Sequence, residues 1–301
     1  MTNTAGVPET KGRTPRGIRW RERLVSIPGN TLVYGILIIW SAISLFGFGW
    51  IVLTSLKTNQ ELYRIKSIWG LPAVPQWANY ARAWTRSKMG NFFFNSVLVS
   101  SATIVLLDIF GSMAAYILAR FRFFGNRAVL AGFILGSAIP VQLITVPLYL
   151  MFNDLGLLDN LVALTMVYIA VSLPFTVFVL TGFFKTLPTE LEEAAVLDGA
   201  TEYAVFWRVM LPLAAPGLIT VTIFNFLGVW NEYLLALMLI NETDKMTIPL
   251  GLYNLKVVQE YAADWTGLFA GFVIVLLPTV IAFIILQDRV TKGMTVGALK
   301  G

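Results

Sequence analysis

The sequence predicts an all-α membrane protein with six transmembrane helices, and three observations lead to that prediction. Of the 301 residues, 57% are hydrophobic and 13% are charged, whereas a soluble domain carries about a quarter of its residues as Asp, Glu, Lys and Arg. The mean hydropathy is +0.73. Six apolar runs reach the roughly 20 residues that cross the hydrocarbon core of a bilayer. So little charge cannot cover the surface of a water-soluble globule, which excludes a soluble enzyme.

The six apolar runs are each predicted to be helical. A membrane-spanning segment must satisfy its own backbone polar groups, and these runs are too long and too uniformly apolar for barrel strands. The first run begins after about 30 residues and lacks the small-residue cleavage site of a signal peptide. Prolines inside the runs, at 140, 147, 174, 216 and 278, are expected to kink or break the helices. The predicted spans are about 31–55, 92–119, 128–152, 158–184, 213–240 and 267–287.

The distribution of Lys and Arg predicts that both termini are cytoplasmic. In that orientation the inner segments carry 14 basic residues and the outer segments carry 8, as the positive-inside rule requires. Residues 1–30 are then a cytoplasmic N-terminal segment, 31–290 the transmembrane domain and 291–301 a cytoplasmic tail. Membrane topology explains the basic excess of the chain better than binding of nucleic acid does.

The chain contains neither His nor Cys. Without them it has no disulfide, no thiolate nucleophile, no Ser–His or Cys–His catalysis and no Cys-based zinc site. We therefore expect no catalytic residues and no metal site, and a protein that moves or holds something rather than an enzyme.

The loop between the fourth and fifth predicted spans, residues 185–212, does not belong in a membrane. The spacing of Thr189 and Glu192 is that of a capping box, which predicts that a helix begins here. Asp198 and Gly199 are expected to end that helix, and a second helix is predicted from about Thr201 to 211. The loop holds the densest group of acids in the chain: Glu190, Glu192, Glu193, Asp198 and Glu202.

The first helix of this loop carries small side chains at Ala194 and Ala195. Small side chains let another backbone approach closely, so this face is predicted to dock against a partner. A solvated amphipathic hairpin fits the same pattern equally well.

The loop resembles the EAA loop of bacterial ABC-importer permeases. The matching positions, at the spacing typical of that loop, are Glu193, Ala194, Ala195, Gly199, Val209, Leu211 and Pro212. Val209 stands where the family usually has Ile, and Asp198, Ala200 and Pro216 also fit the extended pattern.

Other segments are similar to the carbohydrate-importer branch of that family. Asn95-Ser96 is similar to its NS pair, 139–160 to its Pro-containing third span, and 230–233 (Trp-Asn-Glu-Tyr) to its WNE segment. The ending 293–301 resembles the tail of the smaller permease subunit of the maltose importer. The chain is thus identified, by resemblance, as the smaller six-span permease of a maltose-importer-like system.

The resemblance implies the type I importer permease fold in a bacterial inner membrane. It also implies four kinds of partner: a second permease, two ATPase subunits, an extracytoplasmic substrate-binding protein and the lipid bilayer. The loop would be a coupling helix on the ATPase, with Glu193 as its charged anchor, Ala194 and Ala195 as the docking face and Gly199 as the turn. Asp198, Leu211 and Pro212 complete the motif. The dipeptide Gly-Lys never occurs, so no Walker A motif exists here. ATP and Mg²⁺ would bind to the partner ATPase, and this chain would bind no cofactor.

Polar residues inside apolar runs are candidates for a substrate path. Asn225, Gly228 and Glu232 share one helical face by their spacing, and buried acids in spans are functional candidates by default. Alternatively, Glu232 only holds helices together, and Asp108 is more typical of helix-packing glue. The candidate path residues are Asn225, Asn231, Glu232, Tyr233, Ser172 and Thr176.

Outer-loop residues suggest partners and cargo. Aromatic residues there fit either a binding-protein contact or the aromatic belt at the membrane surface; they are Trp77, Tyr80, Trp84, Tyr253 and Tyr261. The leading interpretation is that the chain forms half of a pathway for a sugar or sugar derivative. One alternative is a non-sugar solute such as glycerol phosphate, for which six basic residues in the first outer loop would be suited. The other is a secondary transporter, which would be expected to show internal repeats and paired buried charges.

Overall fold

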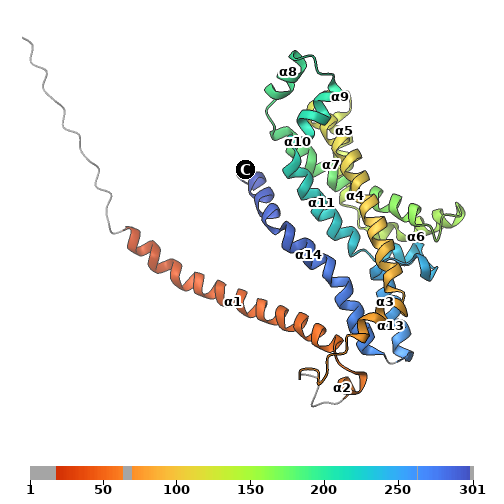
Figure 1. Cartoon of the computed structure of the whole chain (residues 1–301). Helices are drawn as coiled ribbons and strands as arrows, with labels where there is room; N and C mark the ends of the chain where they lie inside the picture. Colours follow the sequence, from red (N-terminus) through yellow and green to blue (C-terminus); the bar gives the residue numbers. More distant parts are fainter. Residues whose placement is uncertain (1–17, 64–69, 263, 299–301) are drawn as a thin grey trace, which may run out of the picture. The chain divides into compact units, whose positions relative to one another are not determined.

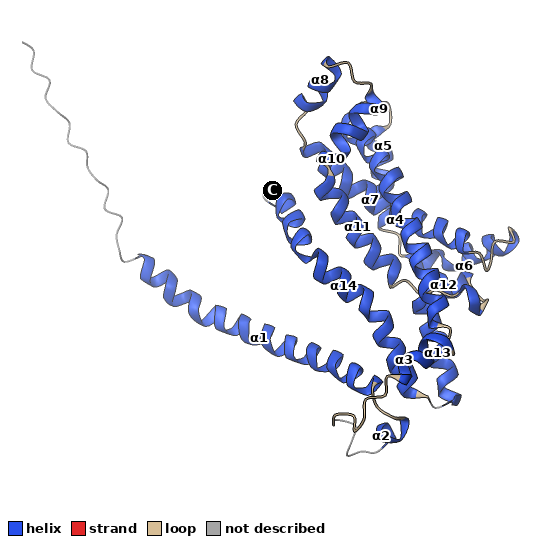
Figure 2. Cartoon of the chain, viewed as in Figure 1, coloured by secondary structure: helices blue, strands red, loops and turns tan. Residues whose placement is uncertain are grey.

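The computed structural model describes residues 18–63, 70–262 and 264–298, and the described residues form helices and no strands (Figures 1 and 2). Residues 1–17 of the predicted N-terminal segment and 299–301 of the predicted tail lie outside the described residues. So do the side chains of 18–30, of 258–262 (which include Tyr261) and of 286–298. The chain divides into two units, residues 1–51 and 52–301.

The first unit consists of most of helix α1, Ile18–Ser55. The helix begins well before the predicted span boundary at residue 31. Its part from Thr31 to Ser55 is long and apolar enough to cross a membrane, and none of its most apolar stretch is buried within the protein. A helix that is apolar on all sides and unburied is typical of a segment that faces lipid or another membrane helix.

The second unit contains three further continuous helices of membrane-spanning length. These are α4 (Met89–Arg120), α7 (Leu161–Thr186) and α14 (Trp265–Ala298). Together with α1 they make four spans, or six if two sharply bent helix pairs each count as one span. The chain is therefore a multi-pass membrane protein, and the predicted number of six is reached only with the bent pairs.

The third predicted span is broken rather than kinked. Helix α5 (Asn126–Ser137) and helix α6 (Val141–Asp154) meet at an angle of 95°. Pro140 stands at the junction in an extended conformation, as the residue before α6. Proline lacks a backbone N–H and disfavours helical geometry in the residue before it, which explains why the helix stops here.

The fifth predicted span is also divided. A helix over Glu202–Leu213, which contains α9 (Glu202–Val205), a π-helical turn (Phe206–Met210) and α10 (Leu211–Leu213), bends by 73° into α11 (Ala215–Trp230). The second helix of the loop was predicted to end at about residue 211, before Pro212, but it continues to Leu213. The N–H of Leu211 bonds to the carbonyl of Phe206, five residues back, and this wider turn carries the chain past the proline. Pro216 lies in the first turn of α11.

The apolar stretch after α11 is not part of that span, although 213–240 was predicted as one. It forms a separate short helix, α12 (Leu234–Leu239), and α13 (Ile248–Ala262) follows it. Composition did not distinguish α12 from the end of a span, because all six of its residues are apolar.

The core of the second unit forms around α4 and α7. Leu107, Leu164 and Leu180 are fully buried there. Gly111 of α4 lies so close to α7 that an added Cβ would be 2.7 Å from the Thr176 methyl group. Small residues of this kind let membrane helices approach closely.

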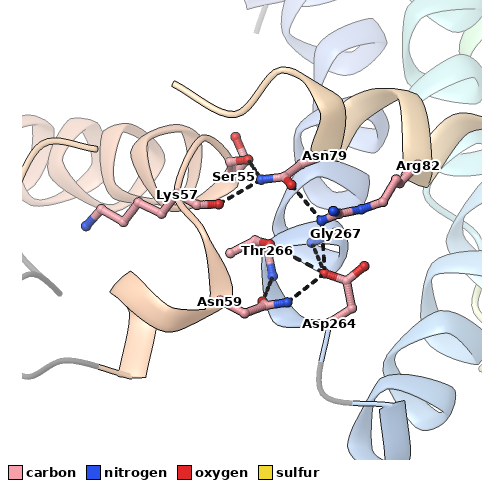
Figure 3. A network of polar contacts seen from close by, with 8 residues as sticks. All are labelled: Ser55, Lys57, Asn59, Asn79, Arg82, Asp264, Thr266 and Gly267. Carbon is pink, nitrogen blue, oxygen red and sulfur yellow. Dashed lines mark hydrogen bonds and ion pairs between the residues drawn. The ribbon is translucent and has the colours of Figure 1, made fainter. Parts of the chain in front are cut away.

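A polar network joins the short helices α2 (Asn59–Tyr63) and α3 (Ala78–Thr85) to the start of α14 (Figure 3). Asn79 donates to the carbonyls of Ser55 (2.7 Å) and Lys57 (2.8 Å), and accepts from Arg82 (2.6 Å). Asp264 accepts from Arg82 (3.3 Å) and from the first turn of α14, at the N–H of Gly267 (3.2 Å). Asp264 therefore caps α14.

Asn95 and Ser96 at the start of α4 hold the segment that leads into α13. The Asn95 amide donates to the carbonyls of Asp244 (2.8 Å) and Met246 (2.9 Å). The Ser96 hydroxyl accepts from the N–H of Ile248 (2.8 Å), the first residue of α13. Ser96 therefore satisfies an N–H that the start of α13 leaves without a partner, and Asn95 fixes the segment before it through two carbonyls.

We predict that Gly251→Ala destabilises the protein. A Cβ on Gly251 would lie 2.0 Å from Cδ2 of Phe92, and Phe92 is itself buried and has little room to move. We expect a cost of about 1–3 kcal/mol, measured as a lower thermal unfolding temperature in detergent. Gly228→Ala, with no atom within 4 Å of the added Cβ, is the control. Equal unfolding temperatures for the two variants would contradict this packing.

Candidate functional site

The acidic loop folds into a helical hairpin at one end of the second unit (Figure 1). Its first helix, α8, covers Glu190–Leu197. Gly199 has a φ of +85°, and its N–H bonds to the carbonyl of Val196 (2.9 Å) while that of Ala200 bonds to Ala195 (3.0 Å). This pair of bonds is a Schellman motif, in which glycine adopts the left-handed conformation without strain. Gly199 is therefore the turn residue that the sequence predicted.

The capping box predicted at the start of α8 does not form. Thr189 is in a helical conformation and its side chain caps nothing. The Glu192 carboxylate is directed instead to Arg120, the last residue of α4, with 2.9 Å between Glu192 Oε1 and Arg120 Nε. A long-range ion pair thus replaces a local hydrogen bond. In the second helix, Thr201 does cap α9, since its hydroxyl accepts from the N–H of Ala204 (3.3 Å).

Arg120 ties the hairpin to the ends of two long helices. Besides Glu192 it contacts Leu187, the residue after α7, through a hydrogen bond of 2.7 Å from Nη2 to the carbonyl oxygen. The side chains of Arg120 and Glu192 are only 9% and 19% exposed. Burial raises the pKa of the Glu192 carboxyl and the Arg120 guanidinium lowers it, and the net pKa lies above the ordinary value. Without Arg120 the pKa of Glu192 would rise further.

The opposite side of the hairpin is open to solvent and partly apolar. Glu193 and Ala194 are exposed, whereas Ala195 is half-buried and packs against the apolar cluster around Tyr116, Phe184 and Phe206. Leu197 is 87% exposed. We call the following exposed residues the hairpin surface: Leu191, Glu193, Ala194, Val196, Leu197 and Tyr203. Of the other predicted motif residues, Asp198 and Pro212 are exposed and Leu211 is half-buried.

Three of the six candidate path residues lie between α7 and α11. The Asn225 amide donates to the Thr176 hydroxyl (2.9 Å), and that hydroxyl donates to the carbonyl of Ser172 (3.0 Å). Asn225 and Thr176 are buried. These two hydrogen bonds connect α7 and α11, as polar side chains between membrane helices commonly do.

Glu232 organises the break between α11 and α12. Its Oε1 accepts from the N–H of Leu235 (2.8 Å), and its Oε2 accepts from Ala236 (3.3 Å) and from the Tyr168 hydroxyl (2.7 Å). A carboxylate that accepts from backbone N–H groups in a first turn stabilises a helix start. Glu232 therefore caps α12 and fixes it to α7, which favours the structural interpretation of this acid.

The remaining two candidate path residues, Asn231 and Tyr233, are exposed at the same break. The Asn231 amide donates to the carbonyl of Leu227 (2.8 Å), and the ring of Tyr233 lies 6.1 Å from that of Tyr253. The six candidates thus form an interhelical contact and a helix cap, with Asn231 and Tyr233 the more accessible pair.

The sequence did not indicate the partners of these acids. Glu232 pairs with Tyr168, Glu192 with Arg120, and Asp108 accepts from the Thr222 hydroxyl (2.7 Å) across α4 and α11. Each pair joins helices that are distant in the chain. Helical periodicity locates a polar residue on a face but not the residue opposite to it.

A cavity of about 400 Å³ lies at the other end of the unit, near α3 and α13. Its lining includes three of the six basic residues predicted in the first outer loop: Arg82, Arg86 and Lys88. Two carboxylates offset part of this charge, since Arg82 pairs with Asp264 (3.3 Å) and Lys88 with Asp244 (2.7 Å).

The aromatic residues of this region have mixed roles. The Tyr80 hydroxyl is hydrogen-bonded to Ser55 (2.6 Å), and the ring of Trp84 lies 5.7 Å from that of Phe93. Trp77 and Tyr253 are exposed and remain available for a contact with a partner or with lipid headgroups.

Comparison with protein families gives a match over residues 109–296 to the model described as binding-protein-dependent transport system inner membrane component. The matched segment begins within α4 and extends into α14, so it includes the hairpin, the Glu232 cap and both bent helix pairs.

Curated relatives match most of the chain. The diacetylchitobiose uptake system permease protein NgcG of Streptomyces coelicolor is 37% identical over 89% of this chain and 88% of the relative. The sulfoquinovosyl glycerol transport system permease protein SmoH of Agrobacterium fabrum is 36% identical over 85% and 89%. The trehalose transport system permease protein SugB of Mycobacterium tuberculosis is 32% identical over 84% and 91%.

Among solved structures, a chain of a bacterial ABC transporter involved in the import of the acidic polysaccharide alginate has a TM-score of 0.76. It is 24% identical in sequence, and the match covers 92% of this chain and 99% of that one. The likeness shows that the two chains share a fold.

We predict that Glu232→Ala lowers stability. It removes the cap of α12 and leaves the buried Tyr168 hydroxyl without its acceptor, at a cost of about 2–4 kcal/mol. The measurement is thermal unfolding in detergent. Asn231→Ala, which removes one exposed hydrogen bond, is expected to change stability by less than about 0.5 kcal/mol. If Glu232→Ala unfolds like the unaltered protein but loses uptake, Glu232 contacts substrate instead.

Proposed function

Because this chain belongs to the family of binding-protein-dependent transport system inner membrane components, we propose that it forms one half of the translocation pathway for a sugar or a sugar derivative. It is a permease subunit and not an enzyme. Relatives named for diacetylchitobiose, sulfoquinovosyl glycerol and trehalose support a carbohydrate cargo. Coupling of this chain to an ATPase is supported by the hairpin, which contacts the ends of α4 and α7 on one side and is exposed on the other.

The hairpin lies on the cytoplasmic side of the membrane, as do both termini. The excess of Lys and Arg in the segments on that side supports this orientation. The cavity near α3 and α13 then faces the extracytoplasmic side.

The hairpin surface docks on a cytoplasmic ATPase. Leu197, Val196 and Leu191 are exposed although they are apolar, and exposed apolar groups of this kind mark contact sites when they lie outside the lipid-facing part of a protein. Glu193, exposed among them, is the charged anchor and pairs with a basic residue of the ATPase. ATP and Mg²⁺ bind on that ATPase, and this chain contributes only the lever.

The other partners follow from the same assignment. A second permease completes the pathway, and two ATPase subunits bind beneath the pair. An extracytoplasmic binding protein delivers the cargo. In support, a second solved structure of the same fold, 13% identical with a TM-score of 0.61, is that of a bacterial alginate ABC transporter in complex with an alginate pentasaccharide-bound periplasmic protein. These partners, in a bacterial inner membrane, are the environment in which the hairpin acts.

An anionic cargo is the second candidate. Arg82, Arg86 and Lys88 line one cavity on the proposed outer side, where their charge attracts a sugar acid or a solute such as glycerol phosphate. A secondary transporter is not favoured, because its chain would carry no hairpin for an ATPase.

The cargo is tested with the cognate binding protein. We expect it to bind a mono- or oligosaccharide, or an anionic derivative, in a calorimetric screen, and the same compound to enter proteoliposomes that contain the complete complex and internal ATP. Binding of neither carbohydrates nor glycerol phosphates would contradict the proposed substrate class.

We predict that Glu193→Arg uncouples the ATPase. The variant places a positive charge opposite the basic partner and should reduce ATP-dependent uptake by about tenfold or more, while the isolated permease remains folded because Glu193 is exposed. Uptake in proteoliposomes and co-purification of the ATPase measure the effect. Asp154→Arg, an equal charge change at the exposed end of α6, is the control. Full uptake by Glu193→Arg would exclude Glu193 as the anchor.

A further inference from the structure

We propose that the ion pair between Arg120 and Glu192 is the positioning contact that transmits movement of the hairpin to α4. This inference rests on the proposed docking of the hairpin on an ATPase, and adds the route by which force enters the membrane. Arg120 and Glu192 are positioning residues that contact neither substrate nor nucleotide. They act by keeping the distance and the angle between α8 and α4 constant.

The contact joins three elements at a single guanidinium. Arg120 ends α4, its Nε lies 2.9 Å from the Glu192 carboxylate in α8, and its Nη2 donates to the carbonyl of Leu187 (2.7 Å) just after α7. The last carbonyls of a helix have no partner within it, so this bond also satisfies the end of α7. The planar guanidinium fixes directions as well as distances, which a lysine would not do.

The buried surroundings of the Arg120–Glu192 ion pair strengthen it. Both side chains are largely buried, so solvent and salt screen their attraction less than at an open surface. Beneath them, Tyr116 of α4 packs against Phe184 of α7 and Phe206 of the π-helical turn, with ring centroids 5.5 and 5.2 Å apart. The ion pair therefore lies next to an apolar cluster to which α4 and α7 both contribute.

Little else holds α8 in place. The helix has only eight residues, fewer than an isolated helix needs to be stable in water. Leu191, Val196 and Leu197 are exposed, and Ala195 is the α8 side chain packed against the apolar cluster. A push on the hairpin surface passes to the membrane helices through α9 and the π-helical turn, through Ala195 and the chain ends, and through Arg120. Among these routes, the Arg120–Glu192 ion pair is the charged contact that leads directly to α4.

The test measures coupling in the reconstituted complex as sugar transported per ATP hydrolysed. Glu192→Gln keeps the size of the side chain and removes its charge, whereas Arg120→Gln removes both bonds of the guanidinium. Arg120→Lys retains the charge but loses the fork geometry. Arg122→Gln, an exposed arginine two residues further on, is the matched control.

We expect Glu192→Gln and Arg120→Gln to co-purify with the ATPase and the second permease, and to lose about tenfold in sugar transported per ATP. The ratio of sugar transported to ATP hydrolysed should be intermediate for Arg120→Lys. For Arg122→Gln it should equal that of the unaltered complex. An unchanged ratio in both glutamine variants overturns the proposal. The proposal is also overturned if neither glutamine variant assembles with the ATPase and the second permease, because the ion pair would then serve folding alone. A complex whose unaltered form shows no ATP-dependent uptake would instead contradict the proposed function.

Discussion

The guanidinium of Arg120 connects the membrane-spanning helices to the acidic hairpin. It forms an ion pair with the Glu192 carboxylate and a hydrogen bond to the Leu187 carbonyl, so the end of α4, the end of α7 and the start of α8 contact one side chain. A permease has no ATP chemistry of its own and can receive the free energy of hydrolysis only as mechanical displacement. A lever serves that purpose if it is stiff at its base and exposed at its tip. The Schellman turn at Gly199 and the partly apolar hairpin surface complete such a lever.

The same requirement, that polar groups find partners away from water, shapes the rest of the second unit. Three hydrogen-bonded pairs join distant helices in this way: Asn225 with Thr176, Oδ2 of Asp108 with Thr222, and Glu232 with Tyr168. Where the chain breaks in an apolar run, a polar residue or a proline stands at the break, as Pro140 and Glu232 do. Unsatisfied groups in hydrocarbon are costly, so these interhelical bonds fix which helices are neighbours. Three of the candidate path residues, Asn225, Thr176 and Glu232, take part in these interhelical bonds.

Local features were predictable from the sequence and long-range ones were not. Four of the predicted spans, the effect of Pro140 and the turn at Gly199 depend on neighbouring residues, and the structure has each of them. The capping box at Thr189 was also a local prediction, and it is wrong because the Glu192 carboxylate is directed to Arg120, more than sixty residues earlier, and not to the backbone N–H of Thr189. Likewise the division of 213–240 depends on Tyr168 and the α12 backbone meeting Glu232. A single sequence contains the acids but not their distant partners.

If Arg120 couples the hairpin to α4, the two move together, and a distance measured between them shows whether they do. The chain has no Cys, so spin labels can be attached at two introduced cysteines without background. Suitable exposed positions are Glu190 of α8 and Phe124, in the loop that the Asn126 amide ties to the carbonyls of Leu118 and Phe121 at the end of α4. We expect pulsed electron spin resonance to give one narrow distance that is the same in the nucleotide-free and ATP-bound complexes. A distance that shifts or broadens between those states would contradict the account.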